Sequence, residues 1–230
     1  IDRWFLSKIE NLVRFENSIQ GRRLSFEEYV TAKKFGYTDN AIRKLSGYET
    51  DYSLSPVYKM VDTCAGEFEA QTPYFYSGYR LPEEGGENEA DNVNADGKRT
   101  VIVLGSGPIR IGQGIEFDYA AVHCAYALRK LGYRVVIINN NPETVSTDFD
   151  MSDRLYFEPL YPEDVLHIIR QEKPLGVVVA FGGQTAIKLT KTLKSEGINI
   201  VGTCADSIDM AEDRERFDAL LERLHLLRPK

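Results

Sequence analysis

The sequence predicts a small all-α domain followed by an α/β domain of the Rossmann-like type, whose sheet is mainly parallel. Three segments with helical periodicity, each preceded by a capping residue, lie within residues 1–47. From Thr100 onward, short apolar runs rich in β-branched residues alternate with further helical segments. Strands too apolar to face water, separated by helices, are typical of a parallel sheet covered on both sides.

The N-terminal helices are predicted from their ends. Asp2 caps the first helix, which carries a stripe of apolar residues and ends at Gly21. Ser25 and Glu28 have the spacing of a capping box at the start of the second helix, and Thr38 caps the third. Because three short helices bury little apolar surface, we expect this all-α unit to pack against another domain.

An aromatic segment and an acidic segment follow these helices. The aromatic segment contains Tyr74, Phe75, Tyr76 and Tyr79. We predict that it is an extended edge segment that docks on a neighbouring domain through these side chains. The second has few large apolar residues, so burial cannot offset the entropy lost on ordering it. We therefore predict a helical domain at 1–80, a flexible acidic linker at 81–99, an α/β domain at 100–205 and a further segment at 206–230.

Apolar runs place the strands of the α/β domain. They predict strands at 101–104, 134–138, 154–157, 176–180 and 199–201. Helices are predicted between these strands, including one continuous helix from Gly182 to Gly197 and a last helix at 213–227. The carboxyl ends of parallel strands meet at one edge of a sheet, and ligands of such folds bind there.

Two glycine-rich loops lie at that edge. Their glycines are Gly105, Gly107, Gly112, Gly114, Gly182 and Gly183. A dinucleotide fingerprint would need a third glycine where Arg110 stands, and an acidic residue after the second strand where the chain has Asn139. No Lys followed by Ser or Thr completes a phosphate-binding P-loop. The spacing leaves open both a phosphate-binding turn and a turn whose glycines only allow close packing.

Polar side chains in the loops at this edge predict a polar pocket. The candidates are Arg110, Gln113, Glu116, Asn141, Glu143 and Thr144. No His or Lys lies in these loops, so a nucleophile with its base is missing and we predict no catalytic residue. The predicted pocket holds or conducts a polar molecule and does not attack it.

Composition narrows the classes of partner. The net charge of −7 argues against nucleic acid or an anionic membrane as a partner. No apolar run approaches the roughly 20 residues of a membrane span and no signal peptide opens the chain, which predicts a cytoplasmic protein. The three Cys and three His residues are widely scattered, so we predict neither disulfides nor a metal site. Both ends of the sequence lie close to helical patterns. We therefore expect this chain to be a piece of a longer polypeptide.

Several stretches of the chain resemble one family, the large subunit of carbamoyl phosphate synthetase. They are GSGPIRIGQGIEFDYAAVHCAYAL, NNNPETVSTDFDMSDRLYFEP, FGGQTAIKL and AEDRERF. IDRWFLSKIENLV and SPVYKMVDTCAGEF resemble the oligomerisation domain that lies between the two synthetase halves of that subunit. NPETVSTD, preceded by this helical domain, resembles the second half, which phosphorylates carbamate. Residues 100–205 then correspond to the pre-ATP-grasp domain and 206–230 to the start of the ATP-grasp region.

The resemblance implies an activity for the whole enzyme. That enzyme makes carbamoyl phosphate from bicarbonate, glutamine-derived ammonia and two ATP, for arginine and pyrimidine synthesis. Its cofactors are ATP and Mg or Mn, and its partners are a glutaminase small subunit and other large subunits. Arg110, Glu116 and Glu143 match residues that line the path of carbamate. The sequence holds no complete ATP-grasp module, so we expect no bound cofactor and no turnover by this chain alone, but association into a homo-oligomer.

Two other hypotheses about the function of the chain remain open. A free-standing Rossmann-type nucleotide-binding module predicts tight binding of ATP or NAD by the isolated chain. A purely structural interaction module predicts that Arg110, Glu116 and Glu143 pair with one another away from any cavity.

Overall fold

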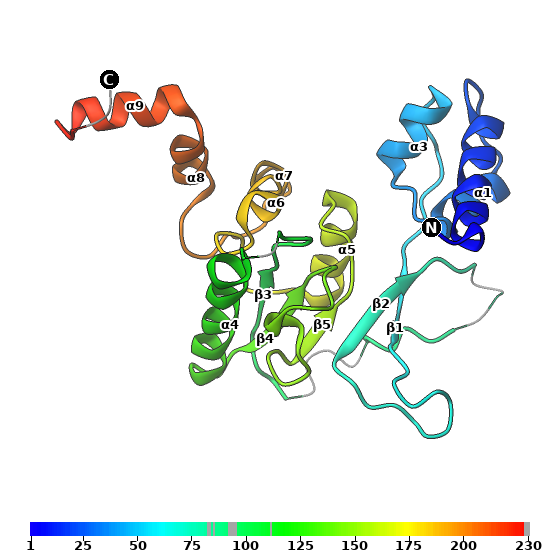
Figure 1. Cartoon of the computed structure of the whole chain (residues 1–230), viewed down its shortest axis with the longest axis horizontal. Coiled ribbons are helices and arrows are strands. Elements are labelled where there is room, and N and C mark those ends of the chain that lie inside the picture. The colour runs from blue at the N-terminus through cyan, green and yellow to red at the C-terminus, as the bar shows by residue number, and fades with distance from the viewer. Residues whose placement is uncertain (82–83, 85, 92–95, 111, 228–230) are drawn as a thin grey trace. The chain divides into compact units, whose positions relative to one another are not determined.

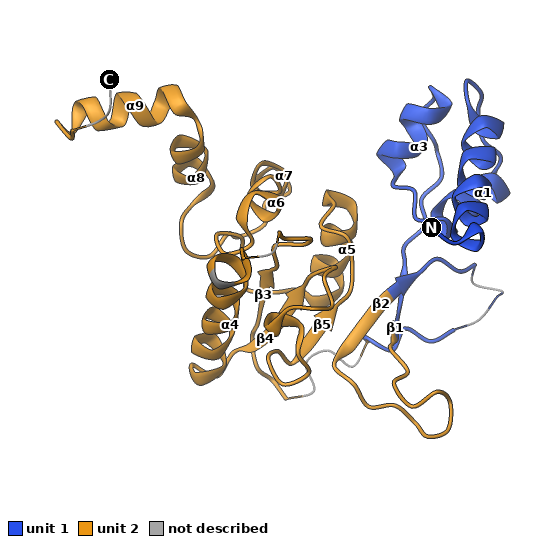
Figure 2. Ribbon diagram, viewed as in Figure 1, with its two compact units in different colours: residues 1–59, 77–90 blue, residues 60–76, 91–230 orange. Residues whose placement is uncertain are grey.

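The structure, a computed structural model, describes residues 1–81, 84, 86–91, 96–110 and 112–227. Ile111 of the first glycine loop, parts of the predicted linker and the last three residues of the predicted C-terminal segment lie outside the described residues. The chain divides into two compact units (Figure 2). Unit 1 comprises residues 1–59 and 77–90, and unit 2 comprises residues 60–76 and 91–230.

Unit 1 contains helices α1 (Arg3–Ile19), α2 (Phe26–Lys34) and α3 (Asp39–Ser46). The three predicted caps are confirmed, because Asp2 accepts the Trp4 N–H, Ser25 and Glu28 form the capping box, and Thr38 accepts the Ala41 N–H. Its core consists of Tyr29, Ala32 and Ile42, with partly buried side chains around them. A core this small leaves much apolar surface of the unit in solvent.

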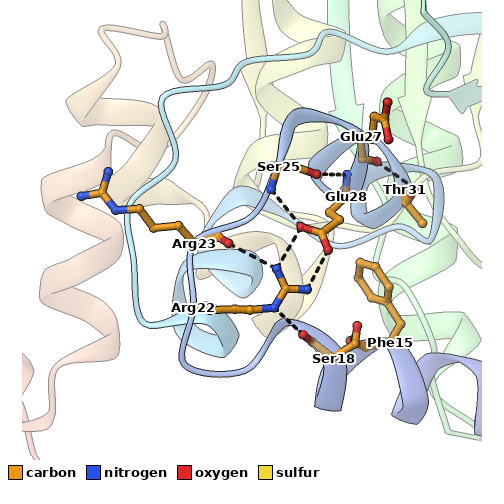
Figure 3. A network of polar contacts seen from close by, with 8 residues as sticks. All are labelled: Phe15, Ser18, Arg22, Arg23, Ser25, Glu27, Glu28 and Thr31. Atoms are coloured by element: carbon orange, nitrogen blue, oxygen red, sulfur yellow. Dashed lines mark hydrogen bonds and ion pairs between the residues drawn. The ribbon is translucent and has the colours of Figure 1, made fainter.

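An ion pair ties the α1–α2 turn to the start of α2 (Figure 3). The guanidinium of Arg22 donates to both carboxylate oxygens of Glu28, at 2.7 and 3.0 Å, and to the carbonyl oxygen of Ser18. Glu28 also accepts the backbone N–H of Ser25 at 2.9 Å. Arg22 and the Ser25 amide lower the pKa of Glu28 to about 2, the hydrogen bond from Arg22 being the larger cause.

The predicted linker contains described residues with defined contacts. In unit 1, Glu84 pairs with Lys34 at 2.6 Å and Ala90 is fully buried. In unit 2, Asp96 pairs with Arg134 at 2.6 Å. Residues 82–83, 85 and 92–95 of this segment lie outside the described residues.

The sheet has six strands in the order β1-β2-β5-β4-β3-β6. Figure 1 labels β1 to β5. The strands are β1 (Val57–Met60), β2 (Tyr74–Gly78), β3 (Thr100–Leu104), β4 (Arg134–Ile138), β5 (Arg154–Tyr156) and β6 (Gly176–Val178). β2 pairs in parallel with β5, β5 with β4, β4 with β3, and β3 with β6. The prediction of a mainly parallel sheet is confirmed. The aromatic segment is extended as predicted, but β1 lies beyond it, so β2 is not an edge strand.

Both faces of the central strands are buried. Helix α4 (Gly114–Lys130) packs its Ala121 and Ala125 against one face, which includes Val101, Val103 and Val135. The alternating residues of β3 and β4, which point to the other face, are also fully buried: Ile102, Leu104, Val136 and Ile138. Strands buried on both faces explain the continuous apolar runs in the sequence.

Several of the remaining elements differ from the predictions. α5 (Pro162–Glu172) lies between β5 and β6, where a helix was predicted. The predicted helix 182–197 forms two helices, α6 (Gly183–Ile187) and α7 (Thr190–Ser195). The predicted strand 199–201 makes only a parallel bridge between Ile200 and Val177, because Gly197 and Gly202 turn the chain at both ends. The last predicted helix is α9 (Arg214–Arg223), and α8 (Ala205–Glu212) precedes it.

Candidate functional site

The first glycine loop is packed against the end of the neighbouring strand. A Cβ atom on Gly105 would lie 2.5 Å from Cγ of Asn139, which follows β4. Gly107 has a φ of +68° and donates its backbone N–H to Oδ1 of Asn139 at 3.0 Å. Asn139 is 1% exposed, so its side chain occupies the space beside Gly105 and satisfies the Gly107 N–H. These contacts favour the packing interpretation of Gly105 and Gly107.

The second glycine loop is packed in the same way. A Cβ atom on Gly182 would lie 2.5 Å from the carbonyl oxygen of Gly105, and one on Gly183 would lie 2.8 Å from the ring of Phe117. Gly112 differs, since its φ is +94° and nothing lies within 4 Å of its Cβ position. Gly114 opens helix α4.

A cavity of about 580 Å³ lies at the start of α4. Its lining residues are Ile109, Arg110, Gly112, Gly114, Asp118, Tyr119, Val122, Asn141, Glu143, Thr144 and Val145. Four of the six predicted polar side chains, Arg110, Asn141, Glu143 and Thr144, therefore meet around one cavity. Gln113 and Glu116 are not among the lining residues, although the Oε1 atom of Gln113 accepts the backbone N–H of Arg110 at 3.0 Å.

The loop after β4 is shaped by its own polar side chains. Oδ1 of Asn139 accepts the Asn141 N–H, and Oδ1 of Asn141 accepts the Glu143 N–H at 3.0 Å. The Thr144 hydroxyl lies 3.3 Å from that of Ser146 in the short 3-10 helix η2 (Val145–Thr147). Asn side chains favour such turns because they bond to backbone groups two residues ahead. The exposed carboxylate of Glu143 is thereby carried on a loop of defined conformation.

Asp118 and the apolar wall of the cavity were not predicted from the sequence. Asp118 lies on α4 and is 7% exposed, and both of its carboxylate oxygens accept the Ser146 backbone N–H, at 3.2 and 3.3 Å. Its position one helical turn after Gly114 was the available signal, since i and i+4 residues share a helix face. Tyr119, Val122 and Val145 add apolar surface to the same cavity.

The cavity combines a cationic side chain with polar and acidic ones, which suits binding of a small polar molecule. In the described part of the lining there is no Ser, Cys, Lys or His side chain. Nor do the described residues of the chain contain a group of three or more His, Cys, Asp and Glu that could hold a metal ion. A search of the same residues for a membrane-crossing helix finds none of sufficient length and apolar character. Arg110 can bind an oxyanion, while Asp118 and Glu143 can accept hydrogen bonds from N–H or O–H groups.

The chain matches two families of domain. Residues 97–210 match the carbamoyl phosphate synthase preATP-grasp domain. Residues 1–57 match the oligomerisation domain of the carbamoyl-phosphate synthetase large chain. The two matches lie in separate parts of the chain.

Curated relatives match along the whole chain. The carbamoyl phosphate synthase large chain of Clostridium botulinum (strain Eklund 17B / Type B) is 54% identical, and that of Thermoanaerobacter sp. (strain X514) is 52% identical. Each alignment includes 100% of this chain and 22% of the relative, so the chain spans about a fifth of the length of these relatives.

Among solved structures, the biotin carboxylase domain of a single-chain bacterial carboxylase aligns with a TM-score of 0.40 and 16% identity, over 56% of this chain and 29% of that one. A similarity this distant does not bear on the function. The family domains and the curated relatives agree with each other on both parts of the chain. The chain therefore belongs to the carbamoyl phosphate synthase large chain family.

Proposed function

We propose that this chain is a supporting segment of a glutamine-dependent carbamoyl phosphate synthase, the enzyme that joins bicarbonate and glutamine-derived ammonia using two ATP. Within it, the α/β unit is the scaffold and conduit that passes carbamate to the second phosphorylation site. The observation that carries this proposal is the meeting of Arg110, Asn141, Glu143 and Thr144 around one cavity whose described lining has no Ser, Cys, Lys or His side chain. The match of residues 97–210 to the preATP-grasp domain supports it.

The chemistry of the cavity suits a short-lived anion in transit. Arg110 offers a guanidinium that has no ion pair within the described part of the chain, so it is available to a carboxylate-like group. Glu143 and Thr144 supply hydrogen-bond acceptors for the amino group of such a molecule. Ile109, Val122 and Val145 add apolar surface to the cavity beside these polar groups.

ATP and Mg or Mn act elsewhere in the proposed enzyme. In the glycine loops, the space beside Gly105 is filled by Asn139 and that beside Gly182 by backbone of the first loop. These loops lack a Lys that would reach a phosphate. We therefore propose that the chain alone binds no nucleotide and catalyses no reaction. We also propose that it is located in the cytoplasm.

Unit 1 supplies the second part of the proposed function, the association of large subunits. Helix α1 exposes a set of large apolar side chains: Trp4, Phe5, Leu6, Ile9, Leu12 and Val13. A contiguous apolar helix face in solvent is typical of a protein interface. The match of residues 1–57 to an oligomerisation domain supports the assignment of this face to other large subunits. A glutaminase small subunit is the other proposed partner of the whole enzyme.

The conduit role is tested with Glu143→Ala in an intact large chain that contains this segment, assembled with its glutaminase. Overall carbamoyl phosphate formation is expected to fall about tenfold or more, the effect of losing a charged hydrogen bond. ATP hydrolysis that depends on bicarbonate, an earlier step, is expected to stay near the parent rate. The control is Glu196→Ala, which removes an exposed carboxylate outside the cavity. Equal loss of both activities in Glu143→Ala would refute the conduit role.

A further inference from the structure

Asp118 is an acidic group in the cavity that the proposed conduit does not yet use. It is 7% exposed, and within the described part of the chain its carboxylate receives hydrogen bonds from a single donor, the Ser146 backbone N–H. That N–H is shared between the two oxygens at 3.2 and 3.3 Å. A carboxylate has about four lone-pair positions, so most of its accepting capacity is left for a molecule in the cavity. Buried carboxylates without enough donors are costly to the folded state.

The same cavity holds a group of the opposite charge. The guanidinium of Arg110 lines the cavity and has no ion pair among the described residues. A small molecule complementary to both residues carries a carboxylate for Arg110 and an N–H donor for Asp118. Carboxylates in which a methyl group replaces the amino group satisfy Arg110 but leave the Asp118 carboxylate without a new donor.

We propose that Asp118 determines the specificity of this cavity by accepting a hydrogen bond from the amino group of a small carboxylate. In this class of molecule the amino group is bonded either to the carboxyl carbon itself or to an adjacent carbonyl carbon. This inference rests on the proposed function, because carbamate is the simplest molecule of this class. Asp118 selects the amino-bearing anion, and Arg110 binds any carboxylate. The bond between Asp118 and Ser146 also holds η2, which follows the loop of Glu143, against α4.

The test uses a matched pair of stable probes, oxamate and pyruvate, which differ by an amino group in place of a methyl group. The ¹⁵N-labelled 230-residue chain is titrated with each probe, and the amide signals of Ser146 and of residues 112–119 are followed by NMR. Oxamate is expected to bind about tenfold more tightly than pyruvate, as one hydrogen bond to a charged group predicts. Arg110→Ala is expected to weaken both probes.

Asp118→Asn separates specificity from structure. The Asn side chain keeps an oxygen that can accept the Ser146 N–H, but it presents an N–H₂ donor to the cavity. The affinity for oxamate is therefore expected to fall about tenfold, while the affinity for pyruvate is expected to change less than about twofold. The control is Asp148→Asn, an exposed carboxylate of the same loop outside the lining, which should leave the ratio of the two affinities unchanged.

The other outcomes overturn the inference in distinguishable ways. If both probes bind with equal affinity and Arg110→Ala weakens both, the cavity binds carboxylates but Asp118 does not determine its specificity. Equal weakening of both probes in Asp118→Asn, with large changes in the η2 amide signals, would make Asp118 a structural residue only. No binding of either probe would contradict the inference together with the proposed conduit.

Discussion

A Cβ atom on Gly182 would lie 2.5 Å from the carbonyl oxygen of Gly105, so the loop after β6 touches the backbone at the end of β3. The φ of Gly182 is −89°, which alanine adopts without strain, so the close approach alone requires glycine here. The glycines of the two loops that meet at the sheet edge thus pack against each other.

The first prediction follows from this contact. Gly182→Ala is expected to lower the free energy of unfolding by about 1–3 kcal/mol, since the added methyl group would lie 2.4 Å from Cβ of Ala186 and 2.5 Å from the Gly105 carbonyl oxygen. Urea unfolding followed by circular dichroism measures the change. The control is Gly132→Ala, where nothing lies within 4 Å of the Cβ position but φ is +84°, with an expected cost of about 1 kcal/mol. A smaller effect at Gly182 than at Gly132 would refute the packing role.

Local patterns in the sequence were enough to predict much of this architecture. The strand at β3 is a run of β-branched residues, and Ser25 with Glu28 carries its capping signal within four residues. Contacts between distant segments were not encoded locally. The position of β2 beside β5, the burial of Asp118 and the contact of Gly182 with Gly105 each depend on residues far apart in the chain.

The candidate site shows the same division. Parallel-strand topology was sufficient to bring Arg110 and Glu143 to one edge, and both line the cavity. It could not tell which side chains of a loop point into a cavity, so Gln113 and Glu116 were included and Asp118 was missed. Gln113 bonds to the backbone of its own loop instead.

The second prediction concerns the buried carboxylate of Glu172 at the end of α5. This residue is fully buried and accepts hydrogen bonds from the Tyr156 hydroxyl and, at 3.1 Å, from Arg154 of β5. Glu172→Ala is expected to cost about 3–5 kcal/mol of unfolding free energy, because a mostly buried cation loses a partner. Chemical denaturation gives the value.

The matched control for this buried pair is the exposed pair of Glu196 and Arg170, whose charged atoms are 3.7 Å apart. Glu196→Ala is expected to cost less than about 0.5 kcal/mol, since exposed pairs contribute little. Similar costs for Glu172→Ala and Glu196→Ala would contradict the role assigned to burial.

The third prediction is a pH dependence within unit 1. The pKa of Glu28 is lowered to about 2, mainly by the hydrogen bond from Arg22. A carboxyl whose folded pKa is depressed stabilises the folded state above its unfolded pKa of about 4.3, and this contribution is lost as the pH falls toward 2. Carboxyl ¹³C NMR titration should give the low pKa, and Arg22→Ala should return it toward its ordinary value. An ordinary pKa in the parent chain would contradict the network in Figure 3.

The fourth prediction concerns the exposed apolar face of α1. Phe5→Glu combined with Ile9→Glu is expected to shift the chain toward monomer in sedimentation velocity, because charges placed in an apolar interface are costly to bury. Ser7→Glu, on the opposite side of the same helix, is the control and should leave the association state unchanged. Monomeric parent protein at all concentrations would remove the proposed role of this face.

The proposed role of the chain is that of a scaffold and conduit, with glycine loops that are packed turns and do not bind phosphate. Isothermal titration of the 230-residue chain with ATP and Mg²⁺ tests this most directly. We predict no binding heat at millimolar ATP, with or without the metal. Saturable binding with a micromolar Kd, lost in Gly107→Ala, would contradict the account and make the first glycine loop a phosphate-binding site.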